Sequence, residues 1–479
     1  MIREYKNLCG KDVDRIDDVY IEQREYLNNG YDKVKKLNSP KLLTGMKPIK
    51  FITPTEQEMG YAVKTNEKDG EWYDYGITSA TRKWANAETE DGSMWVWIPR
   101  YAYKISESGS IDVKFLIGTT DYYYDDNGKM KKAQRATEET TGESYIVHPT
   151  FTDESEIDFA NGGWDKELTG IWIAKFEAGY AGGNNDTKQV NSGVTYANAT
   201  TNYYGSCTTD TKIKYPVFKP TTFSMNNISL QDAYKISKAL TGANNIYGLN
   251  KNKTDADSHL IKNSEWGAVA YLSRSNHGKV SEVTINNANL NNSINTIYGI
   301  TGCTSNSTNA GEIVTTTNGI NNVTGNTATN GIYSWNQVNG QNASTTGNIY
   351  GIYDMNGGLW ERTAAFIYNE TSDMQTYGGV LKNEIGVTRK SSKYITIFAD
   401  VYTSNNTIGD AIRETSVAGA GNTSGWEFAD LSIYFDANNS FFMRGGQYTG
   451  NETTGVFSFN KSDGAVANNS GFRAVLIAE

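Results

Sequence analysis

The sequence predicts an α+β protein that is built mainly from strands and turns, with few helices. Three observations support this class: the composition, strands that are apolar on both faces, and two short amphipathic helices. Only 38% of the 479 residues are hydrophobic, and the mean hydropathy is −0.56. However, 31 Tyr, 16 Phe and 10 Trp can bury large areas, and 47 Gly favour turns. We therefore expect one elaborated domain with an appendage, since the chain exceeds the usual single-domain length.

Residues 1–37 contain the only pattern that predicts a long helix. Val13, Ile16, Tyr20 and Leu27 recur at a spacing of about three to four residues, with charged residues between them. The segment is either a docking or oligomerisation helix, or a helix packed on its own domain.

Residues 38–70 are predicted to form an extended connector. Pro40, Pro48 and Pro54 interrupt regular structure there. Compact structure is expected to resume at Trp72, within a domain that covers residues 71–479.

Two segments of this domain predict strands that are covered on both faces. Residues 94–98 read Met-Trp-Val-Trp-Ile, and residues 171–174 read Ile-Trp-Ile-Ala. Strands without an exposed polar face are typical of the interior of a layered structure.

Two helices are predicted after these strands. Ser229 and Asp232 form a capping-box pattern that opens a helix through Leu240, which Gly242 ends.

The second helix is predicted to begin at Asn263 as its N-cap, with Glu265 in its first turn. Trp266, Val269 and Ala270 would then form its buried stripe.

Three stretches are predicted to be surface insertions, because they are rich in Asn, Thr, Gly and Ser and poor in aliphatic residues. They are residues 181–210, 283–346 and 401–425. Apolar residues such as Val314 predict short strands within the second.

Charge and cysteine content exclude several classes of protein. The formal charge is −10, from 44 basic and 54 acidic residues without a basic stripe, which disfavours nucleic acid as a partner. No apolar run is long enough to span a bilayer, and the first residues lack the apolar segment of a secretory signal. Three distant cysteines argue against a zinc site or a disulfide framework. Cys207 and Cys303 could pair, but unpaired packing cysteines are the favoured interpretation.

Several blocks, taken in order, resemble the formylglycine-generating-enzyme-like (sulfatase-modifying-factor) branch of C-type-lectin folds. Trp172 to Glu177 resembles the family's W-x-x-K-[YF]-E strand, and Glu265-Trp266 lies in a stretch similar to its second helix. The resemblance covers residues 94–477, and its blocks are 94–99, 170–177, 223–240, 258–271, 348–363, 444–446 and 471–473. It implies a C-type-lectin-like domain lengthened by the three insertions.

The namesake enzyme of this family is a copper-dependent oxidase with paired cysteines just beyond an Arg-Gly-Gly turn. Here that segment is residues 447–454, which contain no cysteine, and a soft-metal redox site requires thiolates. His148, His259 and His277 fit no hydrolase motif. We therefore expect a protein that is not an enzyme.

A calcium site is a weaker prediction from the same resemblance. The family's G-N-V-W-E-W stretch is Gly-Gly-Leu-Trp-Glu-Arg at 357–362, so one oxygen ligand is lost. Asp354, Asn356 and Glu361 remain as candidate ligands for Ca²⁺, the only cofactor considered. The alternative is structural: Asp354 caps the turn and Glu361 pairs with an arginine such as Arg473.

Residues 441–476 resemble the variable region of proteins that diversity-generating retroelements target, with its R-G-G-x-[WY] and G-F-R motifs. The resemblance implies a scaffold of fixed residues and a ligand-binding face between them. The scaffold residues are Trp266, Trp360, Glu361, Arg444, Gly445, Gly446, Gly455, Val456, Gly471, Phe472 and Arg473. The expected face consists of Tyr448, Asn451, Thr453, Phe459, Lys461 and Asp463, and Tyr and Asn suit such contacts. The alternative is an ordinary solvated loop.

These observations predict a non-enzymatic displayed binding protein. Its expected setting is a bacteriophage or prophage virion, in a tail, fibre or head decoration that attaches to a host cell-surface glycan or protein. Residues 95–104 look like segments of proteins from Gram-positive gut bacteria and their prophages. We expect a homo-oligomer that contacts other virion proteins through residues 1–37. The alternatives are a bacterial cell-surface adhesin of the same fold and a degenerate member of the oxidase family.

Overall fold

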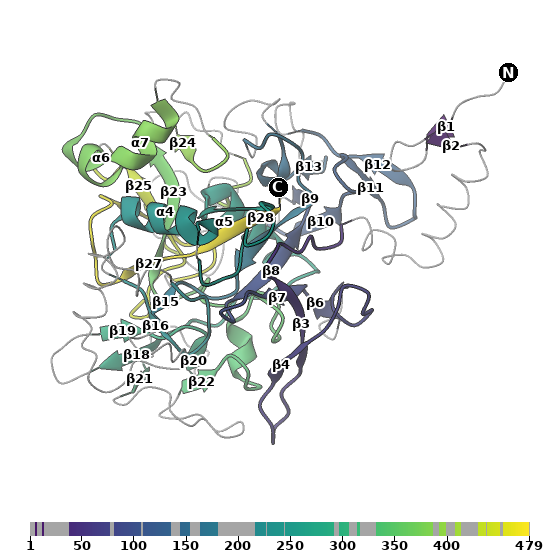
Figure 1. Cartoon of the computed structure of the whole chain (residues 1–479), viewed down its shortest axis with the longest axis horizontal. Helices are drawn as coiled ribbons and strands as arrows, with labels where there is room; N and C mark the ends of the chain where they lie inside the picture. The colour runs from purple at the N-terminus through teal and green to yellow at the C-terminus, as the bar shows by residue number, and fades with distance from the viewer. Residues whose placement is uncertain are drawn as a thin grey trace.

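A seven-stranded antiparallel sheet lies at the centre of the protein, in the order β17-β28-β14-β8-β7-β3-β4. Its strands are β3 (Lys47–Ile52), β4 (Tyr61–Lys64), β7 (Asn86–Glu88), β8 (Met94–Pro99), β14 (Gly170–Ala174), β17 (Ala256–Leu260) and β28 (Ala474–Ala478). Figure 1 shows β28 near helix α5 in the middle of the molecule, and the strand pairs with β14 and β17. The strand nearest the end of the sequence is therefore an internal strand of the main sheet.

This computed structural model describes most of the chain. The described residues are 5–6, 12–13, 38–76, 81–106, 109–135, 144–153, 163–180, 216–226, 228–243, 245–291, 297–305, 314–316, 332–386, 392–398, 408–412, 430–436, 438–450 and 454–478. Strands dominate and helices are few, which agrees with the predicted α+β class.

The two strands predicted from two-sided apolarity are confirmed. β8 pairs with β14 so that Trp97 lies opposite Trp172, and their rings meet edge to face at 5.3 Å. All five residues of β14 are buried, as are all residues of β8 except Met94, which is half-buried. Tryptophan side chains fill one face of these two strands, and Val96, Ile98, Ile171 and Ile173 fill the other.

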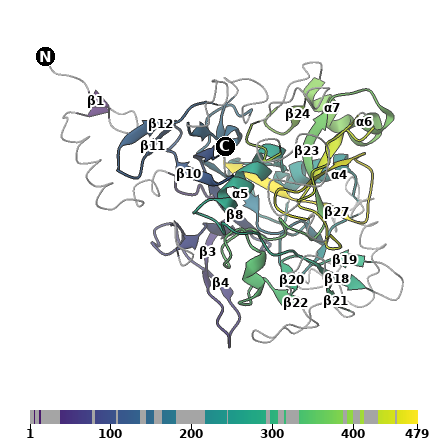
Figure 2. The same cartoon turned by 180° about the vertical axis from the view of Figure 1, so that it is seen from behind.

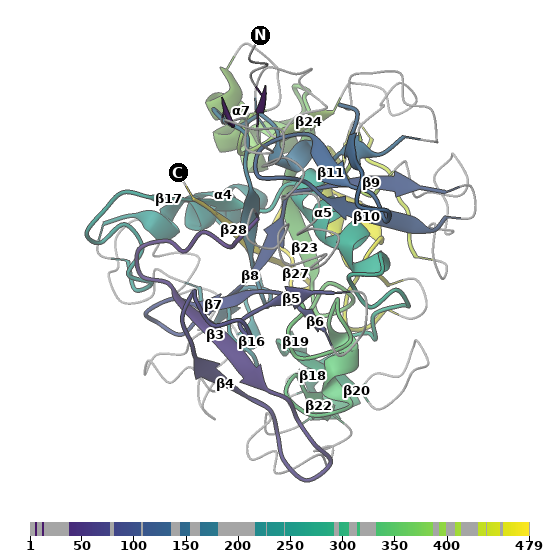
Figure 3. The same cartoon turned by 90° about the vertical axis from the view of Figure 1, so that its right-hand side faces the viewer.

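The prediction of an extended connector at residues 38–70 is wrong. β3 pairs with β7 and β4 pairs with β3, which extends the main sheet to its free edge. Ile49 and Phe51 are buried in β3, and Pro48 accepts a hydrogen bond from Thr65 through its carbonyl. Proline is tolerated in such a strand where its missing N–H is not needed, so the prolines hid an alternating apolar pattern. Figures 2 and 3 show this hairpin projecting from the rest of the molecule.

The predicted N-terminal helix is wrong for the four residues of 1–37 that the structure describes. β1 (Tyr5–Lys6) and β2 (Asp12–Val13) pair as a short antiparallel hairpin. The rest of that segment lies outside the described residues.

Helix α4 (Leu230–Lys238) confirms the first predicted helix. Ser229 is its N-cap and accepts a hydrogen bond from the backbone N–H of Asp232. A short 3-10 turn, η2 (Ala239–Thr241), continues it, and Gly242 ends that turn.

Helix α5 (Asn263–Arg274) is confirmed, but its N-cap is Lys262 and not Asn263. The carboxylate of Glu265 accepts the N–H of Lys262 at 2.8 Å, which moves the helix start by one residue. Eleven of the twelve residues of α5 are buried, so Trp266 belongs to a helix that is covered on all sides.

A second sheet carries the C-terminal motifs. Strand β23 (Trp360–Ile367) is completely buried and pairs with three neighbours: β24 (Thr396–Phe398), β25 (Phe441–Arg444) and β27 (Ser470–Phe472). Strand β26 (Phe459–Ser462) pairs with β25. Helices α4 and α5 both pack on β23, so this sheet and the main sheet share one core.

Small sheets and turns surround these layers. They are β9 (Tyr101–Ile105) with β10 (Ile111–Phe115) and β13 (Ile146–Val147); β11 (Tyr122–Tyr124) with β12 (Met130–Lys132); β5 (Asp74–Tyr75) with β6 (Arg82–Lys83); β15 (Gly179–Tyr180) with β16 (Phe223–Ser224); β18 (Ala288–Asn291) with β19 (Ile297–Gly299) and β21 (Val314–Thr316); and β20 (Cys303–Ser305) with β22 (Ile332–Ser334). The remaining helical turns are η1 (Pro149–Phe151), η3 (Gly340–Ala343), α6 (Ser372–Tyr377) and α7 (Gly379–Ile385).

The insertions differ in how far the structure describes them. Residues 181–210 lie outside it, whereas 283–346 contains β18 to β22, which confirms short strands there. Of 401–425 only 408–412 is described, and its Ala411 and Ile412 are buried. That stretch therefore contributes to the core, contrary to its interpretation as a surface insertion.

Two further predictions concern cysteines and membranes. Cys303 is buried and unpaired, while Cys9 and Cys207 lie outside the described residues. Among the helices of the described part, none has the length and apolarity that crossing a bilayer requires.

Candidate functional site

The candidate site is the segment between β25 and β27, and it begins with the Arg444-Gly445-Gly446 turn. Both glycines have a left-handed backbone, with φ of 83° and 81°. A Cβ on Gly445 would lie 3.1 Å from the Trp266 ring. The turn therefore requires glycine for its backbone conformation and for its close approach to α5.

Arg444 anchors this turn from the inside. Its buried guanidinium donates to the carbonyl oxygens of Asp410 at 2.8 Å, Ala411 at 3.0 Å and Ser458 at 3.3 Å. It also lies 5.6 Å from the Trp266 ring centroid. Burial lowers the pKa of Arg444 to about 10, so the side chain remains charged at neutral pH.

Trp266 fixes the far end of this segment, at Val456. Its indole N–H donates to the carbonyl of Val456 at 2.7 Å, and the side chain is fully buried. Arg444 and Trp266 thus fix the two ends of the stretch from residue 445 to residue 456, and both do so through backbone carbonyls.

A buried ion pair joins the second sheet to the main sheet. Arg473 donates to the two carboxylate oxygens of Glu361 at 3.0 and 2.5 Å, which confirms the expected pairing. The same guanidinium donates to the carbonyls of Ala174 in β14 and Tyr353, at 2.7 and 2.8 Å. Neither charged side chain is exposed.

Two further carboxyl groups lie around this pair. Glu177 accepts from the hydroxyl of Ser224 and from the N–H of Leu359, and Asp354 accepts from the N–H of Gly302 at 2.8 Å. Burial first, and then the charge of Asp354, raises the pKa of Glu177 well above its usual range. Three acidic groups share one guanidinium here, which disfavours the ionised form of Glu177.

The structure places every expected scaffold residue in the interior. Trp360, Gly455, Val456, Gly471 and Phe472 are buried, like the residues described above.

Tyr448 and Phe459 do not lie on an exposed face, which corrects the assignment of both residues. Phe459 is 1% exposed and packs edge to face on Tyr434, with ring centroids 4.8 Å apart. Tyr448 is 5% exposed, and its backbone N–H donates to Gly358 at 2.7 Å. Phe459 belongs to a small aromatic core with Phe398, Tyr434, Phe435 and Phe442. The spacing between motifs could not show which side of β26 faces this core.

Lys461 and Asp463 are accessible. Lys461 is half-buried and forms an ion pair with Asp436 at 2.5 Å. Asp463 is exposed and accepts the N–H of Ala465 at 2.9 Å. The remaining two predicted residues, Asn451 and Thr453, lie outside the described part of the chain.

Three exposed side chains of this segment were missed by sequence reasoning, because no pattern separates them from their buried neighbours. They are Thr449, Val466 and Asn468, and Val466 is 47% exposed. We call the accessible side chains of this segment the C-terminal surface: Thr449, Lys461, Asp463, Val466 and Asn468. A hydrogen bond from Asn469 to Gln447 at 2.7 Å ties its two loops together.

Two of the three candidate calcium ligands are engaged by protein donors, since Asp354 accepts N–H groups and Glu361 accepts from Arg473. The Asn356 amide nitrogen donates to the carbonyl of Val283, and its buried Oδ1 has no hydrogen-bond partner among the described residues. Within the described ranges, no group of three or more His, Cys, Asp or Glu side chains is arranged to hold a metal ion. Calcium binding stays a prediction.

The histidines have structural partners. His259 contacts the carboxylate of Glu265 at 2.8 Å, and both are fully buried at the start of α5. His148 is packed among aromatic rings, and burial lowers its pKa to about 3. His277 contacts the carbonyl of Tyr75.

Comparisons of the chain with protein families and with curated proteins found no relative. No protein-family model matches the chain, and no curated protein sequence matches it significantly. The resemblance to a lectin-like family therefore stays an expectation from the sequence motifs.

Proposed function

We propose that this chain is a non-enzymatic ligand-binding protein that carries a C-type-lectin-like domain of the formylglycine-generating-enzyme-like kind. It is a bacteriophage or prophage virion component that binds a host cell-surface glycan or protein through its C-terminal surface. One observation carries the proposal: a polar loop segment is held at both ends by fully buried anchors.

The meeting of the motif blocks in one core supports the proposed fold. The backbone N–H of Tyr353 donates to the carbonyl of Lys175 at 2.8 Å, and Arg473 donates to the neighbouring carbonyl of Ala174. Glu361 completes the contact through Arg473. Three blocks that are far apart in the sequence thus contact one another where the two sheets join.

The anchoring supports recognition by a preorganised surface. Arg444 and Trp266 order the backbone in the free protein, so less conformational entropy is lost when a ligand binds. Thr449 offers a hydrogen bond from this fixed backbone. Asp463 and Asn468 lie on the following loop, where the carbonyls of Gly464 and Asn468 accept hydrogen bonds from Leu230 and Asn226. Several copies on one particle would raise a weak single-site affinity about a hundredfold or more through effective concentration.

The test is binding of the fluorescent full chain to intact cells of a panel of Gram-positive bacteria. We expect at least one strain to bind the protein, and we expect a variant with four C-terminal-surface residues replaced by alanine to lose at least about tenfold in affinity. The substitutions are Thr449→Ala, Lys461→Ala, Asp463→Ala and Asn468→Ala.

A matched control changes the same residue types, with glutamate for aspartate, on the β3–β4 hairpin, where all four side chains are exposed. Its substitutions are Thr53→Ala, Asn66→Ala, Glu67→Ala and Lys68→Ala. Equal loss in both variants, unchanged binding of the first variant, or no binding to any strain would contradict the proposal.

A further inference from the structure

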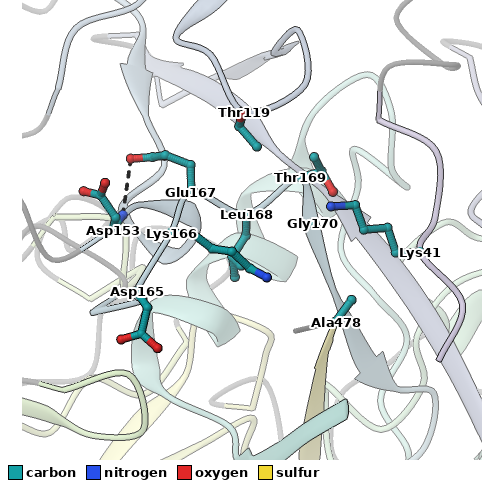
Figure 4. Close-up of a pocket in the computed structure, with 10 residues that line it drawn as sticks. All are labelled: Lys41, Thr119, Asp153, Asp165, Lys166, Glu167, Leu168, Thr169, Gly170 and Ala478. Carbon is teal, nitrogen blue, oxygen red and sulfur yellow. Dashed lines mark hydrogen bonds between the residues drawn. The ribbon is translucent and has the colours of Figure 1, made fainter. Parts of the chain in front are cut away.

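A pocket of about 520 Å³ opens at the start of β14, among segments that are far apart in the sequence. Figure 4 shows the residues that line it: Lys41, Thr119, Asp153, Asp165, Lys166, Glu167, Leu168, Thr169, Gly170 and Ala478. This volume is usual for a site that takes a small molecule.

The backbone around the pocket is firmly held. The indole N–H of the fully buried Trp172 donates to the carbonyl of Lys41 at 2.7 Å. The carbonyl of Thr169 accepts the N–H of Arg100 at 2.8 Å, and the N–H of Leu168 donates to Phe151 at 2.9 Å. The pocket therefore exists before any ligand arrives.

Glu167 is a wall carboxylate that two arginines of the protein neutralise. It pairs with the buried Arg100 at 2.5 Å and with Arg135 at 2.9 Å, and it also accepts the N–H of Asp153. This arrangement keeps its charge away from the lysines of the pocket.

Lys41 and Lys166 lack such neutralisation. In Figure 4 both side chains extend into the space between Thr119 and Ala478. Neither ammonium has an ion pair in the described part of the chain. Partial burial, and then the charge of Lys166, lowers the pKa of Lys41. Two cations directed into one space repel each other, and an anion between them removes that repulsion.

The remaining walls suit hydroxyl groups. Thr119 is an exposed residue of the wall, and its hydroxyl group can both donate and accept hydrogen bonds. Asp165 is exposed on the side of the pocket away from Lys41, where its carboxylate can accept hydrogen bonds. Leu168, Gly170 and Ala478 are the wall residues without a polar side chain, and the others carry charged or hydroxyl groups.

From this arrangement we infer that the pocket is a binding site for a small polyhydroxylated anion, such as a sugar acid or a polyol phosphate. The anionic group lies between Lys41 and Lys166, and the hydroxyl groups contact Thr119 and Asp165. This site is separate from the C-terminal surface, and the inference does not depend on the proposed function.

The experiment is isothermal titration of the full chain at low ionic strength with D-glucuronate, sn-glycerol 3-phosphate and D-glucose. We expect millimolar binding of at least one anion and at least about tenfold weaker binding of glucose. Tighter binding of glucuronate would identify a carboxylate ligand, and tighter binding of glycerol phosphate a phosphate ligand. The double variant Lys41→Gln/Lys166→Gln should bind the anion at least about tenfold more weakly than the wild type does.

The control is Lys64→Gln/Lys68→Gln, which makes the same charge change in exposed residues of the β4 hairpin, at the far edge of the sheet. It should bind like the wild type. As a readout without substitutions, the anion should slow acetylation of Lys41 and Lys166, but not of Lys64, when modified peptides are quantified by mass spectrometry. The inference is overturned if neither anion binds, if glucose binds equally well, or if neither the double variant nor the acetylation pattern responds.

Discussion

Lys175 shows how much a single residue contributes to joining the parts of this protein. Its buried ammonium donates to the side-chain oxygen of Asn86 at 2.9 Å and to the carbonyls of Ile349 and Gly351 at 2.8 and 2.7 Å. It also lies 4.8 Å from the centre of the Phe51 ring. All three N–H donors are used, so this lysine connects β14 to the 349–351 turn and to β7.

Replacing Lys175 by Met keeps most of the volume but leaves the oxygen of Asn86 and two carbonyls without their donor. We expect the free energy of unfolding to fall by about 3 kcal/mol or more, because buried partners would be left unpaired. Urea denaturation measures this change, and Lys68→Met on the exposed hairpin is the control. Equal stability of the two variants would contradict the role assigned to Lys175.

Phe459 allows a second test at the residue scale. Because it is 1% exposed in the small aromatic core, Phe459→Ala should lower the free energy of unfolding by about 3–5 kcal/mol. The exposed Asp463→Ala should change it by less than about 0.5 kcal/mol. Thermal melting of both variants distinguishes the core position from the surface position. A Phe459→Ala protein as stable as the wild type would support the original assignment of Phe459 to the binding face.

At the scale of elements, local sequence patterns predicted β8, β14, α4 and α5 well. In these segments the apolar periodicity and the helix caps involve residues within about ten positions of one another, so the local sequence is enough to predict the element. The β3–β4 hairpin was missed because Pro48 obscured its pattern, and the burial of Phe459 depends on a partner, Tyr434, outside its own strand. The pocket could not be predicted, since Lys41 and Lys166 meet only through the fold.

The Arg444-Gly445-Gly446 turn gives a prediction at the scale of elements. Gly445→Ala would place a Cβ 3.1 Å from Trp266 in a left-handed backbone, so we expect a loss of about 1–3 kcal/mol in stability. The loop should also lose order, which faster amide hydrogen exchange in residues 446–450 would report. Gly379→Ala is the control, because nothing lies within 4 Å of its Cβ position. Similar exchange in both variants would argue against the anchoring role of the turn.

Two buried glutamates, Glu177 after β14 and Glu361 in β23, should make the stability of the protein depend on pH. Burial raises the pKa of Glu177 above 4.5, its value in an unfolded chain, and raises the pKa of Glu361 to about 7 even beside Arg473. The folded state therefore holds protons that the unfolded chain releases. The stability contributed by these groups is complete below pH 4.5 and is lost as the pH rises through about 7.

Glu177→Gln tests this sign, because the amide can accept from Leu359 and donate to Ser224 without titrating. We expect urea denaturation to show a smaller loss of stability between about pH 5 and pH 8 for the variant than for the wild type. The exposed Glu67→Gln should keep the wild-type slope. A steeper loss in Glu177→Gln would mean that Glu177 is ionised in the folded protein.

At the scale of the whole molecule, residues 38–70 belong to the main sheet, and this changes where the chain can be divided. A protein that begins at residue 38 retains β3, β4 and the buried Leu43, whereas one that begins at residue 71 exposes the edge of β7. If residues 1–37 mediate assembly, light scattering should show an oligomer for the full chain and a folded monomer from residue 38. The form from residue 71 should aggregate or unfold. Monomers for both longer forms would remove the assembly role of the N-terminal segment.

The anchors of the C-terminal surface share one property: each grips main-chain oxygen atoms. Arg444 holds the carbonyls of Asp410, Ala411 and Ser458, and Trp266 holds that of Val456. In the following loop, Leu230 and Arg362 donate to the carbonyls of Gly464 and Ala465. Every amino acid supplies the same carbonyl, so the identity of the outward-facing side chains does not enter these contacts. A library randomised at positions 449, 463, 466 and 468 should consequently yield mostly folded members. In evolutionary terms, new specificities could arise here by substitution alone, with little effect on the architecture beneath.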